Sequence, residues 1–155
     1  MPLTEKHIDL ITLGDVQTLL AEQDGPCVSL FLPTHVRGAE TQQNPVQLKN
    51  LLSEAGKKLE AYPADANAKT TLLGPVENLL GDVEFWQHQR EGLALYAGPD
   101  GVWTFRLPYS CPRYCGVSNR FHVKPLVPML TDDGRFYLLA LSQGNVKFFE
   151  GSRYV

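Results

Sequence analysis

The spacing of apolar residues predicts one long amphipathic helix near the first third of the chain. Apolar positions recur three or four residues apart from Leu48 to Tyr62, which is typical of a helix with one buried face. Polar residues follow the same spacing on another side of this helix, at Gln43, Gln47, Asn50, Glu54 and Lys57. We therefore expect one face of the helix to lie on a core and the other to face solvent or a partner.

Other segments have the patterns of strands. The run from Cys27 to Leu32 is apolar at every position except Ser29, which predicts a central strand covered on both faces. Residues 92–97 and 102–107 are strand-like and are joined by Gly98-Pro99-Asp100-Gly101, which predicts a hairpin with a four-residue loop. Residues 117–123 are typical of a further strand, after a loop over 109–116.

Two shorter helical regions complete the pattern. Thr12 and Asp15 have the spacing of a capping box, and Gly25-Pro26 ends the helix that follows. Residues 72–83 carry a second apolar helical stripe, which we expect to be broken at Gly74-Pro75 and at Gly81-Asp82. The order of elements predicts an α/β domain over residues 1–130, with helices packed on a mixed sheet.

The last part of the chain, residues 131–155, predicts a separate hairpin. Two apolar runs flank Gly144-Asn145, a pair suited to a two-residue turn. Because a hairpin cannot bury its faces alone, we expect it to open a second, incomplete domain. Its open edge also favours a homo-oligomer in which two hairpins pair.

Composition narrows the classes of function. The chain has 155 residues and a net charge of −3, which gives no general attraction to nucleic acid or to an anionic membrane. Residues 101–131 contain no acidic residue and carry +4. That stretch is either a local basic surface or a set of solvated side chains. Three cysteines, no secretion signal and no long apolar run favour a cytoplasmic protein without a membrane partner.

Two groups of residues are candidates for chemistry, one that contains cysteines and one that comes after the buried strand. Cys111 and Cys115 with His122 fall short of a zinc ligand set, so we expect no metal and no cofactor. The other group comes directly after the central strand and consists of His35, Arg37, Glu40 and Gln43. His35 is either a general base or part of a structural loop that pairs with Glu40. Without a nucleophile motif or a phosphate loop, the chain by itself is not expected to be catalytic.

Two further groups favour binding. Lys49 and Asn50 continue an amide-rich helix surface that suits RNA, a protein partner or simple solvation. Arg120, His122 and Lys124 alternate with apolar residues, so on a strand they would share one face. Such a face suits phosphate contact and base stacking beside Phe121, or is a solvated sheet surface.

Several stretches taken in order are similar to one family. They are Leu32-Pro33-Thr34-His35, Gly38 with Glu40, Gln43 and Pro45, Leu48-Lys49-Asn50-Leu51-Leu52, Glu84-Phe85-Trp86-Gln87-His88-Gln89, Arg120-Phe121-His122-Val123-Lys124-Pro125-Leu126 and Phe136 to Gln143. The chain resembles the N-terminal portion of the bacterial relatives of the archaeal and eukaryotic peptide-chain release factor. The resemblance implies an N-terminal domain followed by the first hairpin of an RNase H-like domain, and a link to the ribosome or translation.

The departures from the family limit what carries over. The Gly-Gly-Gln loop that hydrolyses peptidyl-tRNA and the Asn-Ile-Lys-Ser stop-codon motif are both absent. Cys115 stands where a further decoding motif, begun at Tyr109, needs Phe. Our main hypothesis is a non-catalytic module that contacts the ribosome, RNA or a translation partner. The alternatives are a hydrolase that uses His35 with residues of missing domains, and a protein-interaction or oligomerisation module.

Overall fold

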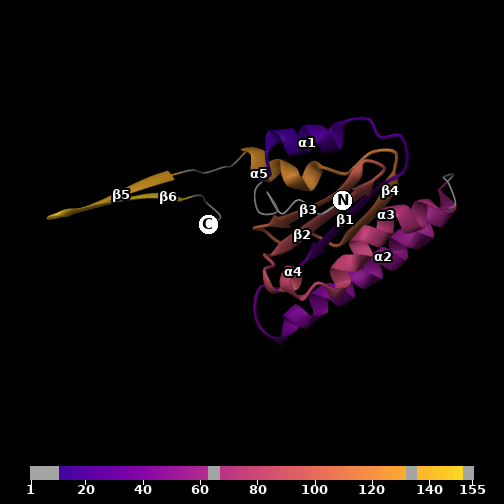
Figure 1. Cartoon of the computed structure of the whole chain (residues 1–155), viewed down its shortest axis with the longest axis horizontal. Helices are drawn as coiled ribbons and strands as arrows, with labels where there is room; N and C mark the ends of the chain where they lie inside the picture. The colour runs from indigo at the N-terminus through magenta and orange to yellow at the C-terminus, as the bar shows by residue number, and fades with distance from the viewer. Residues whose placement is uncertain (1–10, 63–66, 132–135, 152–155) are drawn as a thin grey trace.

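The computed structural model describes residues 11–62, 67–131 and 136–151. Within them, an antiparallel sheet has the strand order β3-β2-β1-β4, and a second sheet is the hairpin β5-β6. The strands of the first sheet are β1 (Cys27–Pro33), β2 (Gly92–Gly98), β3 (Gly101–Leu107) and β4 (Tyr114–Ser118). Figure 1 shows this sheet between two helical layers. The predicted α/β class is confirmed.

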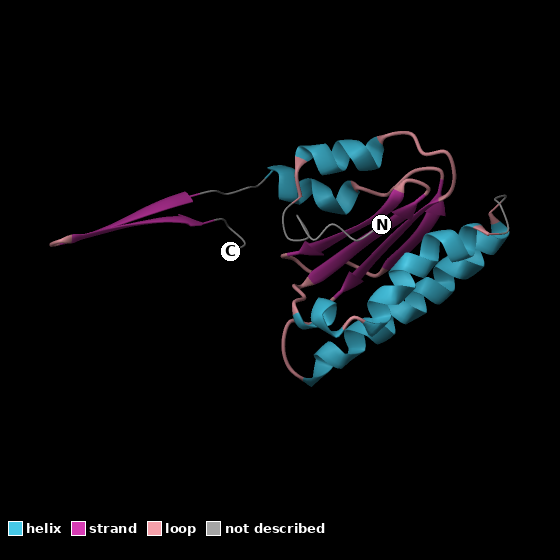
Figure 2. Ribbon diagram, viewed as in Figure 1, coloured by secondary structure: helices cyan, strands magenta, loops and turns pink. Residues whose placement is uncertain are grey.

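The layers follow from the burial of β1. Val28, Leu30 and Leu32 point into a core shared with α2 (Gln43–Ala61) and α3 (Ala68–Glu77). Cys27 and Phe31 point into a second core, which includes Leu19 of α1 (Leu13–Leu20) and Leu126 of the 3-10 turn η4 (Lys124–Leu126). Figure 2 shows α1 and α5 (Val127–Thr131) on one side of the sheet and α2 and α3 on the other. The prediction of a central strand covered on both faces is confirmed.

The sheet is antiparallel throughout its described pairings, which corrects the predicted mixed sheet. The reason is the number of helices between β1 and β2. One crossover helix returns the chain to the start of the first strand and gives a parallel pair. Here α2 and α3 form a helical hairpin, so the chain re-enters the sheet at the end where β1 left it, and Pro33 pairs with Gly92.

The helices keep most of their predicted positions. Thr12 caps α1 through the predicted capping box, and α2 buries Leu48, Leu52, Ala55 and Leu59 as its periodicity predicts. The break predicted at Gly74-Pro75 is wrong, because α3 runs through Pro75 to Glu77. Burial of Leu72, Leu73 and Val76 against the sheet holds this stretch helical despite the proline. The second predicted break is confirmed: the 3-10 turn η3 (Asn78–Gly81) precedes α4 (Val83–Gln87), which Asp82 caps.

Three connections differ from the predictions. Gly98 pairs with Gly101, so the β2–β3 turn is Pro99-Asp100 and not a four-residue loop. Ser142 of β5 (Phe136–Ser142) pairs with Asn145 of β6 (Asn145–Gly151), so this turn is Gln143-Gly144, with Gly144 at a φ of 88°. The strand predicted over 117–123 instead spans Tyr114–Ser118, so it begins within the predicted loop and ends early in the predicted strand.

The chain leaves the sheet after Ser118 because its partner strand ends there. Ser118 pairs with Cys27, the first residue of β1, so residues 119–123 have no strand to continue along. Instead, the backbone of His122 is held by two side chains of the sheet: its N–H donates to Ser29 Oγ and its C=O accepts from Tyr96 Oη, both at 2.9 Å. Arg120, His122 and Lys124 therefore do not share a strand face, which corrects that prediction.

The hairpin β5-β6 forms its own sheet and extends away from the first one in Figure 1. The predicted boundary between residues 130 and 131 falls in α5, and residues 132–135 of the connecting turn lie outside the described residues. The structure confirms the hairpin as a separate pair of strands. The division into domains stays a prediction.

Candidate functional site

The structure places the predicted site residues in two groups. His35, Arg37, Glu40 and Gln43 lie in the connection from β1 to α2, and Lys49 and Asn50 lie on the exposed side of α2. Arg120, His122 and Lys124 lie in the segment 119–126, which packs on the opposite face of the sheet. The sheet lies between Lys49 and Asn50 on one side and Arg120 and His122 on the other, so one compact site does not contain both groups.

The connection at His35 is fixed by a residue that the sequence reasoning missed. Asn44 is completely buried, and its side chain both accepts from the His35 N–H and donates to the His35 C=O, each at 2.9 Å. His35 Nδ1 lies 4.0 Å from Glu40 Oε2, and the His35 and Glu40 side chains are 42% and 71% exposed. Asn44 precedes Leu48 by one helical turn and stands on the apolar face of α2. A polar residue on that face was the available signal.

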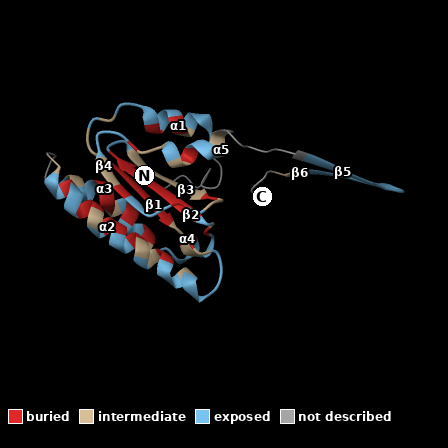
Figure 3. Ribbon diagram, turned by 180° about the vertical axis from the view of Figure 1, so that it is seen from behind, coloured by how far each residue is buried: buried red, intermediate tan, exposed pale blue. Residues whose placement is uncertain are grey.

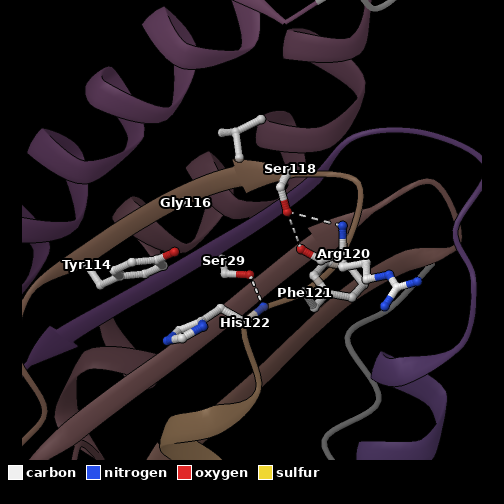
Figure 4. Close-up of a pocket in the computed structure, with 8 residues that line it drawn as sticks. Ser29, Tyr114, Gly116, Ser118, Arg120, Phe121 and His122 are labelled. Atoms are coloured by element: carbon white, nitrogen blue, oxygen red, sulfur yellow. Dashed lines mark hydrogen bonds between the residues drawn. The ribbon is translucent and has the colours of Figure 1, made fainter.

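A hollow opens on the other face of the sheet, beside the edge strand β4 (Figure 4). Its volume is about 210 Å³. Ser29 of β1 lies at its base, and β4 and the segment 120–122 form its walls. The lining residues are Ser29, Tyr114, Gly116, Val117, Ser118, Arg120, Phe121 and His122. The structure thus brings two of the predicted residues, Arg120 and His122, to one site.

A pair of neighbouring, tilted rings, Tyr114 and His122, dominates this site. Their centroids are 4.7 Å apart and their planes are inclined by 32°. Tyr114 can lie along β4 because Gly116 has no side chain: a Cβ at Gly116 would stand 2.5 Å from the Tyr114 hydroxyl. Phe31 packs near both rings, 5.7 Å from Tyr114 and 5.8 Å from His122 between centroids. Tyr114 is nevertheless 40% exposed, so the pair is supported from below and open to solvent.

The sequence reasoning missed Tyr114 because it assigned residues 109–116 to a loop. The alternation of Tyr114, Gly116 and Ser118 with the apolar Cys115 and Val117 is a strand signal that could have found it. In the structure the first set lies on the face of Ser29 and Phe31, and Cys115 lies in the core under α2.

The acid-free stretch 101–131 is only partly one surface. Arg106 lies 5.7 Å from the Phe85 ring, under the helices and away from the hollow. Arg113 pairs with Glu54 at 3.2 Å at the edge of β4. Arg120 and Lys124 are exposed, and within the described part of the chain neither has an ion-pair partner. Arg120, which lines the hollow with Tyr114 and His122, is therefore available to an anionic ligand there, and Lys124 is exposed two residues after His122.

The open edge of β4 is occupied by charges of α2. Lys58 Nζ donates to the Cys115 C=O at 2.7 Å and pairs with Glu54 at 3.0 Å. The hydrogen bond from Lys58, with the charges of Lys58 and Arg113, lowers the pKa of the Glu54 carboxyl against its slight desolvation. A lysine that caps a free edge carbonyl discourages strand addition at this position. The ring face of β4 is therefore more accessible to a ligand than its backbone edge.

The cysteines cannot form one metal site. Cys111 lies in the core on the Phe31 face and contacts the Leu32 C=O, whereas Cys115 lies in the core under α2 and contacts the Leu51 C=O. The sheet separates the two thiols. Burial raises the pKa of both, and raises that of Cys27 to about 11, so the thiolate forms needed for metal binding or nucleophilic attack are disfavoured. Among the residues described, no cluster of three metal-ligating side chains occurs.

Comparison with known proteins gives the fold alone. No protein-family model matches the chain, and no curated protein matches its sequence. A solved structure described as an archaeal protein is similar over 90% of this chain, with a TM-score of 0.51 and 15% sequence identity. The chain spans 44% of the length of that protein. Across the described ranges, the helices lack the combination of length and apolar content needed to cross a bilayer.

Proposed function

We propose that this chain is a non-catalytic module that contacts RNA through the ring face of β4 and the segment 119–124. In the full protein, the module would belong to a release-factor-like chain that acts at the ribosome or on a translation partner. The proposal rests on the resemblance and on one observation of the site. The exposed Tyr114 and the half-buried His122 line one hollow together with Arg120, and Lys124 follows His122 by two residues; neither cation has an acidic partner in the described chain.

These groups have complementary roles in RNA binding. Phosphate contacts by Arg and Lys supply most of the affinity and make it depend on salt. Aromatic rings supply surfaces on which bases stack. This stacking tolerates any sequence because every base has a π face. The net charge of −3 opposes non-specific binding over the whole chain, so the interaction is expected to be local.

The predicted residues on the other side of the sheet have a weaker claim. Lys49 and Asn50 are exposed on α2, and Gln43 starts the same helix, so they form a second surface that suits a partner protein or the remainder of the full chain. His35 and Arg37 lie at the helix entrance, where the bonds from Asn44 already explain the local geometry. The assignment of the hairpin to an RNase H-like second domain remains part of the proposal.

The test measures RNA binding by the chain over a salt series, with fluorescence anisotropy as the readout. The double variant R120A/K124A should weaken binding at low salt and reduce the slope of log K against log salt by about 1.4, since each lost phosphate contact removes about 0.7. The double variant K49A/K57A is the matched control, because it removes two exposed positive charges from α2 on the opposite layer.

The two variants separate the possible surfaces. Weaker binding by R120A/K124A alone supports the proposal. A loss confined to K49A/K57A would move the RNA surface to α2 and overturn the assignment to β4. No binding by the wild-type chain at low salt would overturn the function itself, and co-sedimentation with ribosomes gives the same comparison in the native setting.

A further inference from the structure

The Tyr114–His122 pair separates two hollows. On one side lies the hollow of about 210 Å³ above Ser29. On the other side lies a second hollow of about 160 Å³, lined by Phe31, Cys111, Pro112, Arg113, Tyr114, His122 and Pro125. Tyr114 and His122 are the residues that line both. The ring pair is therefore a wall with a cavity on either side.

The size of the hollows indicates the kind of ligand. Small-molecule pockets typically measure about 300–1,000 Å³ and enclose most of their ligand. Each hollow here is smaller and open to solvent, with volumes of about 210 and 160 Å³. They suit single flat groups of a longer ligand, one on each side of the rings, better than a whole cofactor.

The wall between the hollows is held rigidly. The His122 backbone is bonded through its N–H to Ser29 Oγ and through its C=O to Tyr96 Oη, and its imidazole lies 5.8 Å from the Phe31 ring. Tyr114 is confined between the imidazole and the bare backbone of Gly116. A preorganised aromatic surface loses little conformational entropy when a base stacks on it.

We propose that the site binds an unpaired stretch of nucleic acid, with consecutive bases on either side of the Tyr114–His122 pair and the phosphates near Arg120 and Lys124. This inference rests on the proposed RNA-binding function and names its substrate class. A duplex keeps its bases stacked and paired inside the helix, so they cannot enter two hollows beside a protein ring. The ligand is therefore single-stranded.

The test compares ligands of equal charge. The chain is titrated at one salt concentration with single-stranded RNA and, separately, with duplex RNA that has the same number of phosphates. Base stacking on aromatic residues contributes about 1–3 kcal/mol per base, so single strands should bind about 5- to 150-fold more tightly than duplex. Single-stranded DNA is titrated as a further arm. Binding as tight as that of single-stranded RNA indicates contacts to bases and phosphates, and weaker binding indicates a contact to the 2′-hydroxyl.

Variants of the tyrosine identify the stacking surface. Y114A should lose about 5- to 150-fold in affinity for the single strand, and Y114F should retain most of it because the ring remains. Y62A is the matched control, since Tyr62 is a partly exposed tyrosine at the end of α2, on the other side of the sheet. Ring-proton shifts of Tyr114 and His122 by NMR, measured on titrating the wild-type chain with single-stranded RNA, report stacking without any substitution.

The outcomes distinguish this inference from the function on which it rests. Equal binding of single-stranded and duplex RNA, with Y114A as tight as wild type and the rings unshifted, overturns the stacking proposal. If R120A/K124A still weakens binding in that case, the RNA-binding function stands as a phosphate contact. Absence of binding to every oligomer at low salt overturns both.

Discussion

The central strand β1 and the hairpin β5-β6 are similar in composition but have opposite surroundings in this molecule. The side chains of β1 from Cys27 to Leu32 are nearly inaccessible, whereas the large apolar side chains described in β5 and β6 are all substantially exposed. Figure 3 shows the contrast between the first sheet and the hairpin. Both are apolar runs with strand character, so the local signal was the same. The difference is that helices cover both faces of β1 and no described element covers the hairpin.

The hairpin also has one face that is more apolar than the other. Cross-strand pairing joins Leu139 with Phe148 and Leu141 with Val146, and Tyr137 stacks on Phe148 at 5.5 Å. These five side chains share a face, and each is more than half exposed. An isolated two-stranded hairpin is marginally stable in water, so this face needs a partner surface to become stable. Both regions therefore have secondary structure, but only the first sheet with its two helical layers, here called the sandwich, has burial.

The largest expected contrast is between one leucine in each region. L30A removes a side chain that is 1% exposed and should lower the free energy of unfolding by about 2–5 kcal/mol, because it leaves a cavity in the core under α2. L141A removes a side chain that is 70% exposed and should change it by less than about 0.5 kcal/mol. Urea denaturation of both variants checks the pair. Similar losses would show that the hairpin is packed.

A buried polar residue should come next in size. N44A leaves the N–H and C=O of His35 without their protein partner, at a cost of about 1–3 kcal/mol in the free energy of unfolding. N50A, at an exposed position of the same helix, is the control and should have almost no effect. Thermal and urea unfolding measure both. A neutral N44A would mean that water replaces the amide, and the loop at His35 would then owe its shape to other contacts.

The uncovered hairpin face predicts self-association. We expect the chain to form dimers in a concentration-dependent way through β5-β6, as the apolar face seeks cover. F148K places a charge on that face and should weaken the dimer at least about tenfold, or by about 1.4 kcal/mol. S142K adds the same charge at the turn end of the opposite face. Sedimentation equilibrium compares them, and a wild-type monomer at high concentration would contradict the prediction.

The smallest effect concerns acid. The pKa of Glu54 is below its ordinary value of 4.5 in the folded chain, through the hydrogen bond from Lys58 and the charges of Lys58 and Arg113. Its contribution to stability is therefore complete above the unfolded pKa and is lost as the pH falls through the lower, folded pKa. E54Q should make the free energy of unfolding of the sandwich less dependent on pH below about pH 4.5. The difference should be less than about 1 kcal/mol because the pair is exposed.

Urea midpoints measured from pH 7 downwards test this prediction. E22Q, which changes an exposed acid without an ion-pair partner in the described chain, is the matched control. If E22Q and E54Q lose the same stability in acid, the network at the edge of β4 contributes nothing specific. The hairpin has no part in this network. Deleting the hairpin from the chain should therefore leave the acid dependence of the sandwich unchanged.

Sequence patterns alone predicted the elements whose local and periodic signals agree. The apolar stripe of α2, the capping box at Thr12 and the two-sided burial of β1 followed from spacing alone, because helices and strands have fixed periods. The same patterns also identified Arg120 and His122 as candidates. They could not place them, because residues 119–123 have strand-like alternation but lie beyond the end of the strand with which they would pair.

Tertiary structure decided everything that depends on which segments meet. The sheet is antiparallel because α3 continues through Pro75 and completes a helical hairpin, and packing against the sheet outweighs the local cost of that proline. The Tyr114–His122 pair forms because Gly116 leaves room for Tyr114, while Ser29 and Tyr96 hold the backbone of His122 beside it. These are contacts between residues far apart in the sequence, and their energies appear only once the chain has brought them together.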